Sequence, residues 1–199
     1  MMGLLGIAIA YLLGSIPFGY LLTRFATGRD VRTEGSGNIG ATNVVRAAGP
    51  SVGIATLVLD MAKGTLAVWI AGWLTDGSPG WMADAALAVL AGHAFPAFLS
   101  FKGGKTVATF AGAFGYLMPL PLLASVVVFA IMVAATRYVS VGSVVGAAMF
   151  PLGAWIIMHP SLVEILVSIL GCGFIIYRHL PNLERIRAGV EPKFSWSKR

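Results

Sequence analysis

The chain has 199 residues, of which 57% are hydrophobic and only 11% are charged, and its mean hydropathy is +0.84. Soluble domains carry about a quarter charged residues, so this composition excludes an ordinary soluble protein and predicts a single membrane domain over residues 1–199. The formal net charge of +6 does not indicate nucleic-acid binding, because the sequence has no solvated basic face with interleaved aromatic residues.

Apolar segments dominate the chain and predict an all-α, polytopic membrane protein. A membrane-spanning helix needs about 20 apolar residues, and suitable segments lie near residues 3–23, 52–74, 83–100, 106–121, 122–136, 141–158 and 161–177. The expected number of spans is therefore seven. The fourth and fifth segments are joined only by residues 118–121, which include two prolines, so the stretch 106–136 is the one place where two spans could instead be one.

The positions of the basic residues predict the orientation. With seven spans, 13 of the 14 Lys and Arg residues fall in connections on one side of the membrane, and the exception, Lys63, lies inside the second segment. Connections rich in Lys and Arg face the cytosol. We therefore expect the N-terminus outside and the C-terminus in the cytosol.

The longest inner connection, residues 33–43, is rich in glycine and in hydrogen-bond donors. Closely spaced glycines allow backbone N–H groups to converge on an anion, and an arginine suited to phosphate oxygens follows at the start of the second span. A flexible turn is the competing interpretation. The density of donors favours a phosphate site, whose candidate residues are Ser36, Gly37, Asn38, Gly40, Thr42, Asn43 and Arg46.

The second inner connection contains Gly103-Gly104-Lys105-Thr106, which superficially resembles a nucleotide-binding P-loop. It lacks the G-x-x-x-x-G-K spacing and a preceding strand, so we exclude that interpretation. The remaining prediction is a glycine turn that presents Lys105, with Lys102 nearby, to an anion.

Three phenylalanines of this region, Phe95, Phe98 and Phe101, recur at helical spacing. They favour a helix face packed on its neighbours over an acyl-chain groove. His93 is expected to be an ordinary interfacial histidine rather than a catalytic residue.

Polar residues also mark the last inner segment and two of the spans. His179 and Asn182 supply directional hydrogen bonds that membrane anchoring by arginine does not require. Asp60 and Lys63 are three residues apart in the second span, so they share a helix face and can neutralise each other. Ser143 opens the sixth span, where a serine usually bonds to its own helix backbone.

Four motifs follow one another along nearly the whole chain: the string from Ser36 to Asn43, Asp60-x-x-Lys63-Gly64, Gly92-His93-x-Phe95-Pro96 continuing to Lys102-Gly103-Gly104-Lys105, and His179-x-x-Asn182-x-x-Arg185-x-x-x-Gly189-x-Glu191. Together with Ser15-x-Pro17-x-Gly19, they closely resemble the bacterial acyl-phosphate:glycerol-3-phosphate 1-acyltransferases.

This resemblance implies a seven-helix enzyme of phospholipid synthesis that transfers an acyl group from acyl phosphate to glycerol 3-phosphate, gives lysophosphatidic acid and needs no metal or cofactor. It implies catalytic roles for Ser36, Lys105, His179 and Asn182. It implies substrate or phosphate binding by Gly37, Asn38, Gly40, Thr42, Asn43, Arg46, Lys102, Gly103, Gly104 and Ser143. The resemblance leaves open a contact with the soluble enzyme that makes acyl phosphate.

The expected chemistry is direct attack by the glycerol hydroxyl on the activated acyl carbonyl, without a covalent enzyme intermediate. Cys172 lies in mid-span, and no histidine begins an H-x-x-x-x-D motif. Either His179 or a phosphate oxygen of a substrate accepts the proton, and the resemblance favours the phosphate. A membrane anion transporter is the alternative function, but the polar residues cluster at inner helix ends rather than at the midplane.

Overall fold

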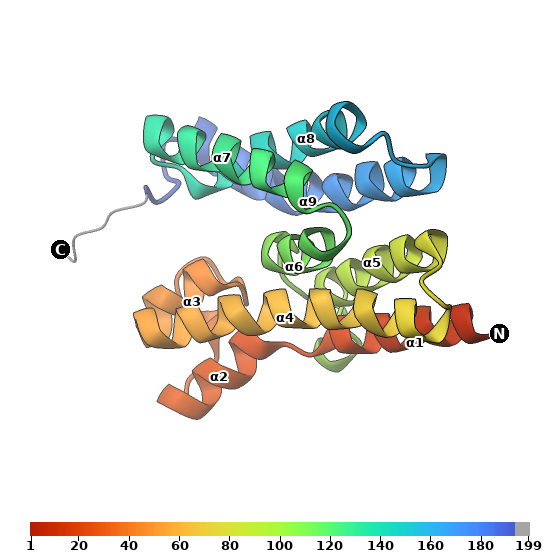
Figure 1. Cartoon of the computed structure of the whole chain (residues 1–199). Coiled ribbons are helices and arrows are strands. Elements are labelled where there is room, and N and C mark those ends of the chain that lie inside the picture. Colours follow the sequence, from red (N-terminus) through yellow and green to blue (C-terminus); the bar gives the residue numbers. More distant parts are fainter. Residues whose placement is uncertain (194–199) are drawn as a thin grey trace. The chain divides into compact units, whose positions relative to one another are not determined.

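The protein is all-helical in the computed structural model, which describes residues 1–193 (Figure 1). The described chain forms two compact units, residues 1–117 and 118–193. Unit 1 contains α1 (Met2–Ser15), α2 (Phe18–Thr27), the short 3-10 helix η1 (Val31–Thr33), α3 (Ala41–Ala48), α4 (Pro50–Leu74), α5 (Pro79–Ala94), the 3-10 helix η2 (Ala97–Leu99) and α6 (Val107–Leu117). Unit 2 contains α7 (Pro119–Thr136), α8 (Val139–Met158) and α9 (Leu162–Arg187).

Six helical segments of the described chain are long and apolar enough to cross a membrane. They are Met2–Thr27, Pro50–Leu74, Pro79–Leu99, Pro119–Thr136, Val139–Met158 and Leu162–Arg187, while α6 is apolar but has only 11 residues. Large apolar side chains such as Trp73, Leu120 and Ile156 are more than half exposed on these helices, as expected where lipid replaces water. The stretch 106–136 does form two helices, but α6 is shorter than a standard span, so the count of seven stays a prediction.

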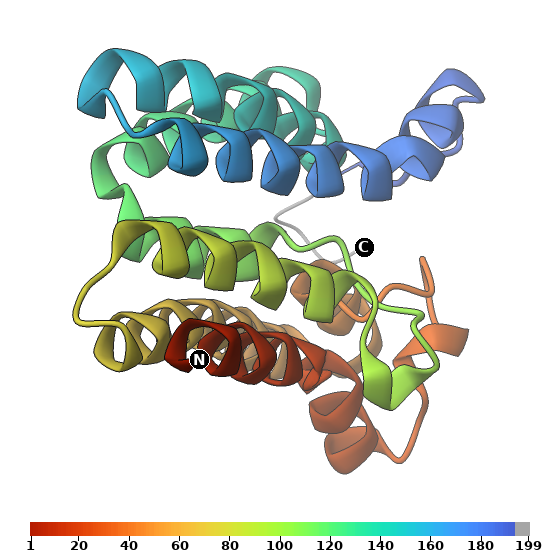
Figure 2. The same cartoon turned by 90° about the vertical axis from the view of Figure 1, so that its right-hand side faces the viewer.

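The first predicted span is interrupted at Ile16 and Pro17, where α1 ends and α2 begins. A residue before proline is disfavoured in the helical region, and Ile16 adopts an extended conformation with ψ of 115°. Figure 2 shows the change of direction between the two red helices. The break turns α2 away from α1 and leads the chain into the glycine-rich loop.

The helices of unit 1 approach one another closely at glycines. A Cβ atom added to Gly112 of α6 would lie 1.9 Å from the Met61 carbonyl oxygen of α4, and one added to Gly64 would lie 2.3 Å from the Thr109 carbonyl oxygen. Gly14 and Gly92 serve the same purpose where α1 crosses α5. Small residues at such crossings let helix backbones come together, which is how membrane helices gain packing energy.

Replacing Gly112 by alanine is therefore expected to destabilise the fold by about 1–3 kcal/mol, because the added methyl group must push α6 away from α4. The measurement is the thermal unfolding midpoint in detergent. Gly153→Ala in α8 is the matched control, since its added Cβ would meet nothing within 4 Å. An unchanged midpoint for Gly112→Ala would show that the crossing tolerates the methyl group.

The prediction of a packed phenylalanine face at residues 95–101 is wrong. Helix α5 ends at Ala94, and Pro96 leads into the single turn of η2, so the three rings do not share one helix. Phe98 is 60% exposed and Phe101 is 61% exposed. These rings project outward from a loop instead of packing on neighbouring helices.

In unit 2, α8 packs against both α7 and α9. Helix α9 begins with a capping box between Ser161 and Glu164 and continues to Arg187, ten residues beyond the predicted end of the span at 177. His179 and Asn182 therefore lie on a helix rather than in a loop. Their spacing of three places them on the same helix face.

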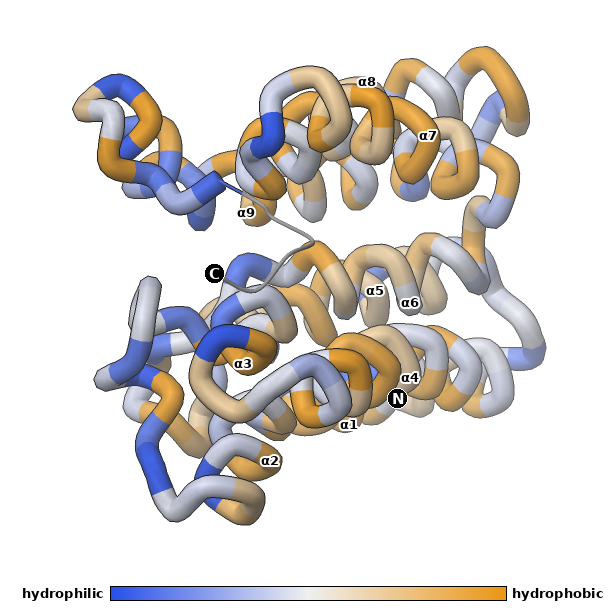
Figure 3. Tube along the Cα trace, turned by 90° about the vertical axis from the view of Figure 1, so that its left-hand side faces the viewer, coloured by the Kyte–Doolittle hydropathy of each residue, from blue (hydrophilic) through white to orange (hydrophobic). Residues whose placement is uncertain are grey.

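Hydrophilic residues concentrate at particular ends of the helices. Figure 3 shows them mainly in the connection between α2 and α3 and at the end of α9, whereas the long helices are largely apolar. Within unit 1, this polar region is where the predicted phosphate site lies.

Candidate active site

The glycine-rich loop between η1 and α3 is organised by the buried side chain of Asn43, which is only 2% exposed. Its Nδ2 lies 3.1, 3.0 and 2.9 Å from the carbonyl oxygens of Val31, Glu34 and Asn38, and its Oδ1 accepts a 2.9 Å hydrogen bond from the Ser36 N–H group. All polar atoms of this side chain are thus used within the loop. Asn43 holds the loop in shape.

The backbone N–H groups of this loop are also engaged internally. Gly37 N–H donates to the Glu34 carbonyl oxygen at 2.9 Å, and Gly40 N–H donates to Asn38 Oδ1 at 2.7 Å. The expected nest of N–H groups from Gly37 and Gly40 is therefore not directed at an anion in this structure. The remaining expectation is binding through side chains, of which Ser36, Thr42 and Arg46 are exposed and Asn38 is half-buried.

Arg46 differs from the other arginines of this region. Arg24 donates to the Gly28 carbonyl oxygen, Arg29 lies 3.8 Å from Glu34, and Arg32 binds Asp30 at 2.6 Å. The hydrogen bond from Arg32 holds the pKa of Asp30 below its usual value, as expected for a formed ion pair. Arg46 has no acidic partner within residues 1–193, so its guanidinium is available to an anion.

The second loop is fastened to the end of α5 by its own backbone. Gly103 N–H donates to the Ala94 carbonyl oxygen at 3.2 Å, and Gly104 N–H donates to the His93 carbonyl oxygen at 3.0 Å. These bonds explain how the turn presents Lys105 just before α6. Lys105 is half-buried, whereas Lys102 is exposed.

Backbone strain is concentrated in this second loop. Ser100, Phe101 and Thr106 adopt positive φ angles of 50°, 61° and 62°. Non-glycine residues in this region cost about 1 kcal/mol or more each, and such strain tends to occur at functional sites.

A small hydrophobic cluster joins the two loops of unit 1. Leu99 of the second loop packs with Val31, Ile39 and Val44, which belong to η1, the glycine-rich loop and α3, respectively. The structure thereby brings the segment that carries Ser36, Asn38 and Arg46 together with the segment that carries Lys105. Figure 2 shows the two connections side by side.

In unit 2, the predicted residues lie on α8 and α9. His179 is 3% exposed, and its Nδ1 lies 2.7 Å from the Ile175 carbonyl oxygen. A carbonyl only accepts hydrogen bonds, so Nδ1 carries the proton and Nε2 has the lone pair in the neutral ring. Ser143 Oγ donates to the Val139 carbonyl oxygen at 3.0 Å, the backbone bond expected for a serine at this position.

Asn182 is held by Glu191, which follows α9. Asn182 Nδ2 donates to Glu191 Oε1 at 2.6 Å, while its buried Oδ1 has no hydrogen-bond partner in the described chain. Glu191 also accepts hydrogen bonds from Arg185 Nε at 2.8 Å and from Ser140 Oγ at 3.2 Å. This arrangement fixes the amide so that its oxygen remains to accept a bond from a hydroxyl.

The comparisons with known proteins identify the family of the chain. Residues 4–189 match the protein family described as glycerol-3-phosphate acyltransferase. The chain belongs to the glycerol-3-phosphate acyltransferase family. Two curated family members are 44% identical over 190 residues (Desulforamulus reducens; 95% of this chain and 94% of the relative) and 48% identical over 193 residues (Trichlorobacter lovleyi; 96% and 97%).

Solved structures of the family have the same fold. The chain is similar to a crystal structure of PlsY, an integral membrane glycerol 3-phosphate acyltransferase, in its glycerol 3-phosphate form, with a TM-score of 0.92 and 35% identity. The match covers 98% of this chain and 96% of PlsY. As a member of the glycerol-3-phosphate acyltransferase family, the chain is a multi-pass membrane acyltransferase that acts in phospholipid biosynthesis.

The hydrogen bonds that Glu191 accepts make the stability of this acyltransferase dependent on pH. Burial raises the pKa of Glu191, but the hydrogen bonds from Asn182, Arg185 and Ser140 outweigh it and hold that pKa below its ordinary value of 4.5. A lowered pKa stabilises the fold above the ordinary value, and this stabilisation is lost as pH falls through the lowered pKa. We expect the thermal unfolding midpoint in detergent to decrease when the pH is lowered below about 4.5.

Glu191→Gln provides the control for this pH dependence, because glutamine retains the side-chain length but cannot become charged. The variant should be less stable at pH 7 and should show a smaller difference between pH 7 and pH 4. A variant with the same pH dependence as the wild type would show that another carboxyl group is responsible.

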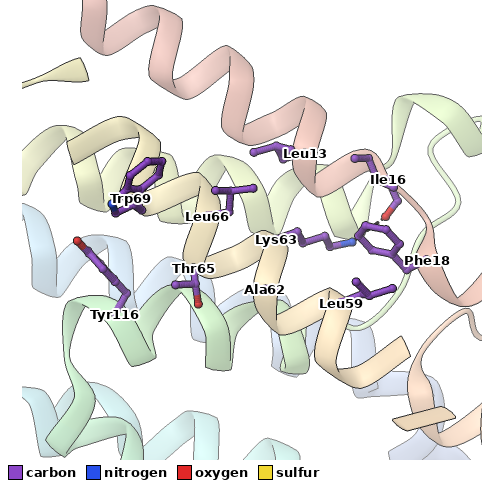
Figure 4. Close-up of a pocket in the computed structure, with 10 residues that line it drawn as sticks. All are labelled: Leu13, Ile16, Phe18, Leu59, Ala62, Lys63, Thr65, Leu66, Trp69 and Tyr116. Atoms are coloured by element: carbon purple, nitrogen blue, oxygen red, sulfur yellow. Dashed lines mark hydrogen bonds between the residues drawn. The ribbon is translucent and has the colours of Figure 1, made fainter. Parts of the chain in front are cut away.

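Sequence reasoning missed the structural roles of Asn43, Ser140 and Glu191. Glu191 was visible only as the last member of a motif, and its partners could be identified only when α9 was known to continue past Asn182. An open groove of about 550 Å³ in unit 1 was also not predicted, and its lining contains none of the residues predicted for the site (Figure 4).

Proposed function

We propose that the protein transfers a fatty acyl group from acyl phosphate to the 1-hydroxyl of glycerol 3-phosphate and releases lysophosphatidic acid and phosphate. The observation that carries this proposal is the exposed Arg46, which has no acidic partner in the described chain and is joined through Leu99 to the loop that presents Lys105. Two cationic side chains suit a phosphate-bearing substrate. The related PlsY structures in glycerol 3-phosphate and lysophosphatidic acid forms support the acceptor and the product.

In the proposed reaction, the hydroxyl oxygen attacks the acyl carbonyl carbon directly. A carbon–oxygen bond to glycerol forms, the bond between the carbonyl carbon and the phosphate oxygen breaks, and a substrate phosphate oxygen takes the proton. Acyl phosphate is an activated anhydride, so this route needs no nucleophile from the protein. Cys172 is 3% exposed within α9 and is not assigned a role. Lys105 and Arg46 stabilise the developing negative charge.

We assign His179 and Asn182 to the glycerol moiety. His179 Nε2 and Asn182 Oδ1 are acceptor atoms held by the Ile175 carbonyl and Glu191, respectively, and both side chains are at least 95% buried. Acceptors of this kind orient a hydroxyl group for attack. Ser36, Asn38 and Thr42 are assigned to phosphate binding with Arg46.

Replacing His179 by glutamine tests whether His179 orients the hydroxyl group of glycerol 3-phosphate or accepts its proton. Glutamine can accept a hydrogen bond but is not a base at neutral pH, so we expect a raised KM for glycerol 3-phosphate, a smaller loss in kcat and a retained fall in activity at acidic pH. Phosphate monoesters titrate near pH 6, which accounts for the retained acidic limb. Loss of that limb together with a collapse of kcat would instead identify His179 as the general base.

The donor is tested with purified protein, glycerol 3-phosphate and either palmitoyl phosphate or palmitoyl-CoA. Acylation should occur with palmitoyl phosphate and be negligible with palmitoyl-CoA. Equal or faster turnover with palmitoyl-CoA would refute the acyl-phosphate proposal but would leave the family assignment intact.

We further propose a single domain over residues 1–199 in the bacterial cytoplasmic membrane, with seven spans, the N-terminus outside and both the C-terminus and the active site facing the cytosol. The distribution of 13 basic residues supports this topology. A fluorescent reporter that folds only in the cytosol should be active at the C-terminus. Activity of a C-terminal reporter that requires the periplasm would reverse the orientation.

A further inference from the structure

A buried lysine forms hydrogen bonds with the backbone at the break between α1 and α2. Lys63 of α4 is 3% exposed, and its Nζ donates to the carbonyl oxygens of Gly14 and Ile16 at 3.0 and 2.9 Å. Carbonyl groups at the end of a helix lack intrahelical partners, and Pro17 prevents the helix from continuing. Figure 4 shows the Lys63 side chain extending from α4 toward Ile16 and Phe18.

Two further ionisable side chains lie beside this lysine. Asp60 Oδ1 is 2.9 Å from Lys63 Nζ, as its spacing in the sequence predicted, and 3.7 Å from His93 Nδ1. Asp60 and His93 are 2% and 4% exposed. Burying charged groups within a membrane helix is costly, and groups retained there usually serve function. The ion pair explains how Asp60 and Lys63 are tolerated, but it does not explain why His93 is also present.

The other side of the His93 ring lies against the Lys105 loop. A Cβ atom added to Gly104 would lie 2.1 Å from His93 Nε2, so only glycine fits beside the imidazole. In addition, the Gly104 N–H group donates to the His93 carbonyl oxygen. His93 thus contacts the residue that immediately precedes Lys105 through both its ring and its backbone.

The end of α1 also holds the beginning of the same loop. Tyr11 donates from its hydroxyl to the Phe95 carbonyl oxygen at 2.9 Å, and Ser15 Oγ accepts a 3.3 Å bond from the Ala97 N–H group. The end of α1 and His93 therefore both bond to the loop, and the Asp60–Lys63 pair lies beside α1 and His93.

We propose that His93 is a positioning residue for Lys105, and that Asp60 and Lys63 hold the His93 ring in place. Asp60 constrains the imidazole from one side, and the ring determines where the Gly103–Gly104 backbone can lie on the other. This inference rests on the proposed role of Lys105 and deepens it. His93 does not contact the substrate in this proposal and acts only through the loop.

A double-mutant cycle between His93 and Lys105 tests this coupling. His93→Asn in the otherwise wild-type protein should lower kcat/KM about 10- to 100-fold, a range typical of coupled neighbouring residues. In a Lys105→Ala background, the same substitution should change kcat/KM less than about twofold, because the residue it positions is already absent. His159→Asn, at an exposed site after α8, is the matched control and should have no effect in either background.

Equal losses from His93→Asn in both backgrounds, or no loss in the first, would overturn the proposal. The Lys105→Ala variant by itself tests the proposed function: if it retains wild-type turnover, the phosphate assignment of Lys105 fails whatever the result at His93. Lys105→Arg is a second background that keeps a cation, in case turnover of the alanine variant is too low to measure.

A second experiment distinguishes an effect of the buried pair on the position of Lys105 from an effect on folding. Asp60→Asn leaves the Lys63 ammonium buried without its charge partner and should lower the thermal midpoint in detergent. The double substitution Asp60→Leu/Lys63→Met removes both charges but also the Lys63 bonds to Gly14 and Ile16, so it should recover part of the midpoint lost in Asp60→Asn while kcat/KM stays low, about as in His93→Asn. Recovery of both the midpoint and kcat/KM would show that the buried pair serves folding alone and would overturn its assigned part in positioning.

Discussion

Replacing Lys105 by alanine is expected to lower kcat for acyl transfer by about 100-fold or more, the loss typical when a preorganised charge-stabilising group is removed from an active site. Lys105 is half-buried at the end of a loop whose backbone is fixed to α5, so its ammonium is held in place before substrate arrives. The measurement is turnover with palmitoyl phosphate and glycerol 3-phosphate in detergent. The thermal midpoint is measured alongside turnover, so that a folding defect is separated from a loss of catalysis.

Two further variants serve as comparisons for Lys105→Ala. Lys105→Arg retains the positive charge and should recover part of the activity. Cys172→Ser, a buried substitution in α9, should retain nearly wild-type turnover, since no covalent thiol intermediate is proposed. Near-wild-type turnover of Lys105→Ala at normal membrane yield would rule out a phosphate-binding role for this lysine.

Replacing Arg46 by alanine should have the next largest effect. A charge-assisted hydrogen bond contributes about 1.5–3 kcal/mol, so we expect kcat/KM to fall at least about tenfold, and more if the bond strengthens in the transition state. Arg46 lies on α3 close to Gly35, where an added Cβ would be 3.9 Å from Arg46 Cδ. The Arg46 side chain therefore passes beside the glycine-rich loop.

Arg24→Ala is the matched control for Arg46→Ala, because Arg24 lies on α2 in the same unit and donates to the Gly28 carbonyl oxygen. Both variants lose one positive charge from the polar region of unit 1. If general electrostatic attraction of anionic substrates were the cause, both variants should lose activity to a similar degree, and their difference from the wild type should shrink as the salt concentration rises. A loss confined to Arg46→Ala indicates a specific contact.

Much of the fold could be predicted from the sequence because membrane helices must be long and apolar. The positions of α4, α7 and α8 agree with the predicted segments within about three residues. The breaks were harder to predict. The hydropathy of residues 3–23 gives no sign that the chain extends at Ile16, and the apolar residues 95–100 continue the pattern of α5 after Pro96 has ended the helix.

The sequence predicted candidate site residues but not the hydrogen bonds that the structure gives them. Glycine content predicted N–H groups free for phosphate, whereas the structure uses those of Gly37 and Gly40 within the loop. The pairing of Asp60 with Lys63 is confirmed because a spacing of three fixes it locally. The contact of His93 with Gly104 depends on the chain reversing after α5, and no local spacing could predict it.

The difference in length between α4 and α5 has a consequence for where the reaction can take place. The two helices are connected by residues 75–78, so the end of α4 and the start of α5 lie at the same level, but α4 has 25 residues and α5 has 16. At 1.5 Å per residue, α5 is about 13 Å shorter. The end of α5, and the Lys105 loop bonded to it, therefore stop well short of the level at which α4 begins, which places the loop below the surface of a membrane that α4 spans.

At that depth, the Lys105 ammonium can contact the polar headgroup of a lipid substrate whose acyl chain stays in the membrane. Lifting a palmitoyl chain into water would cost about 0.8 kcal/mol for each CH₂ group, or roughly 12 kcal/mol for the whole tail. A recessed loop avoids this cost, since the acyl carbonyl lies near the boundary between headgroups and hydrocarbon. In the proposed reaction, only the small, water-soluble glycerol 3-phosphate then has to travel, and the lysolipid product forms within the membrane.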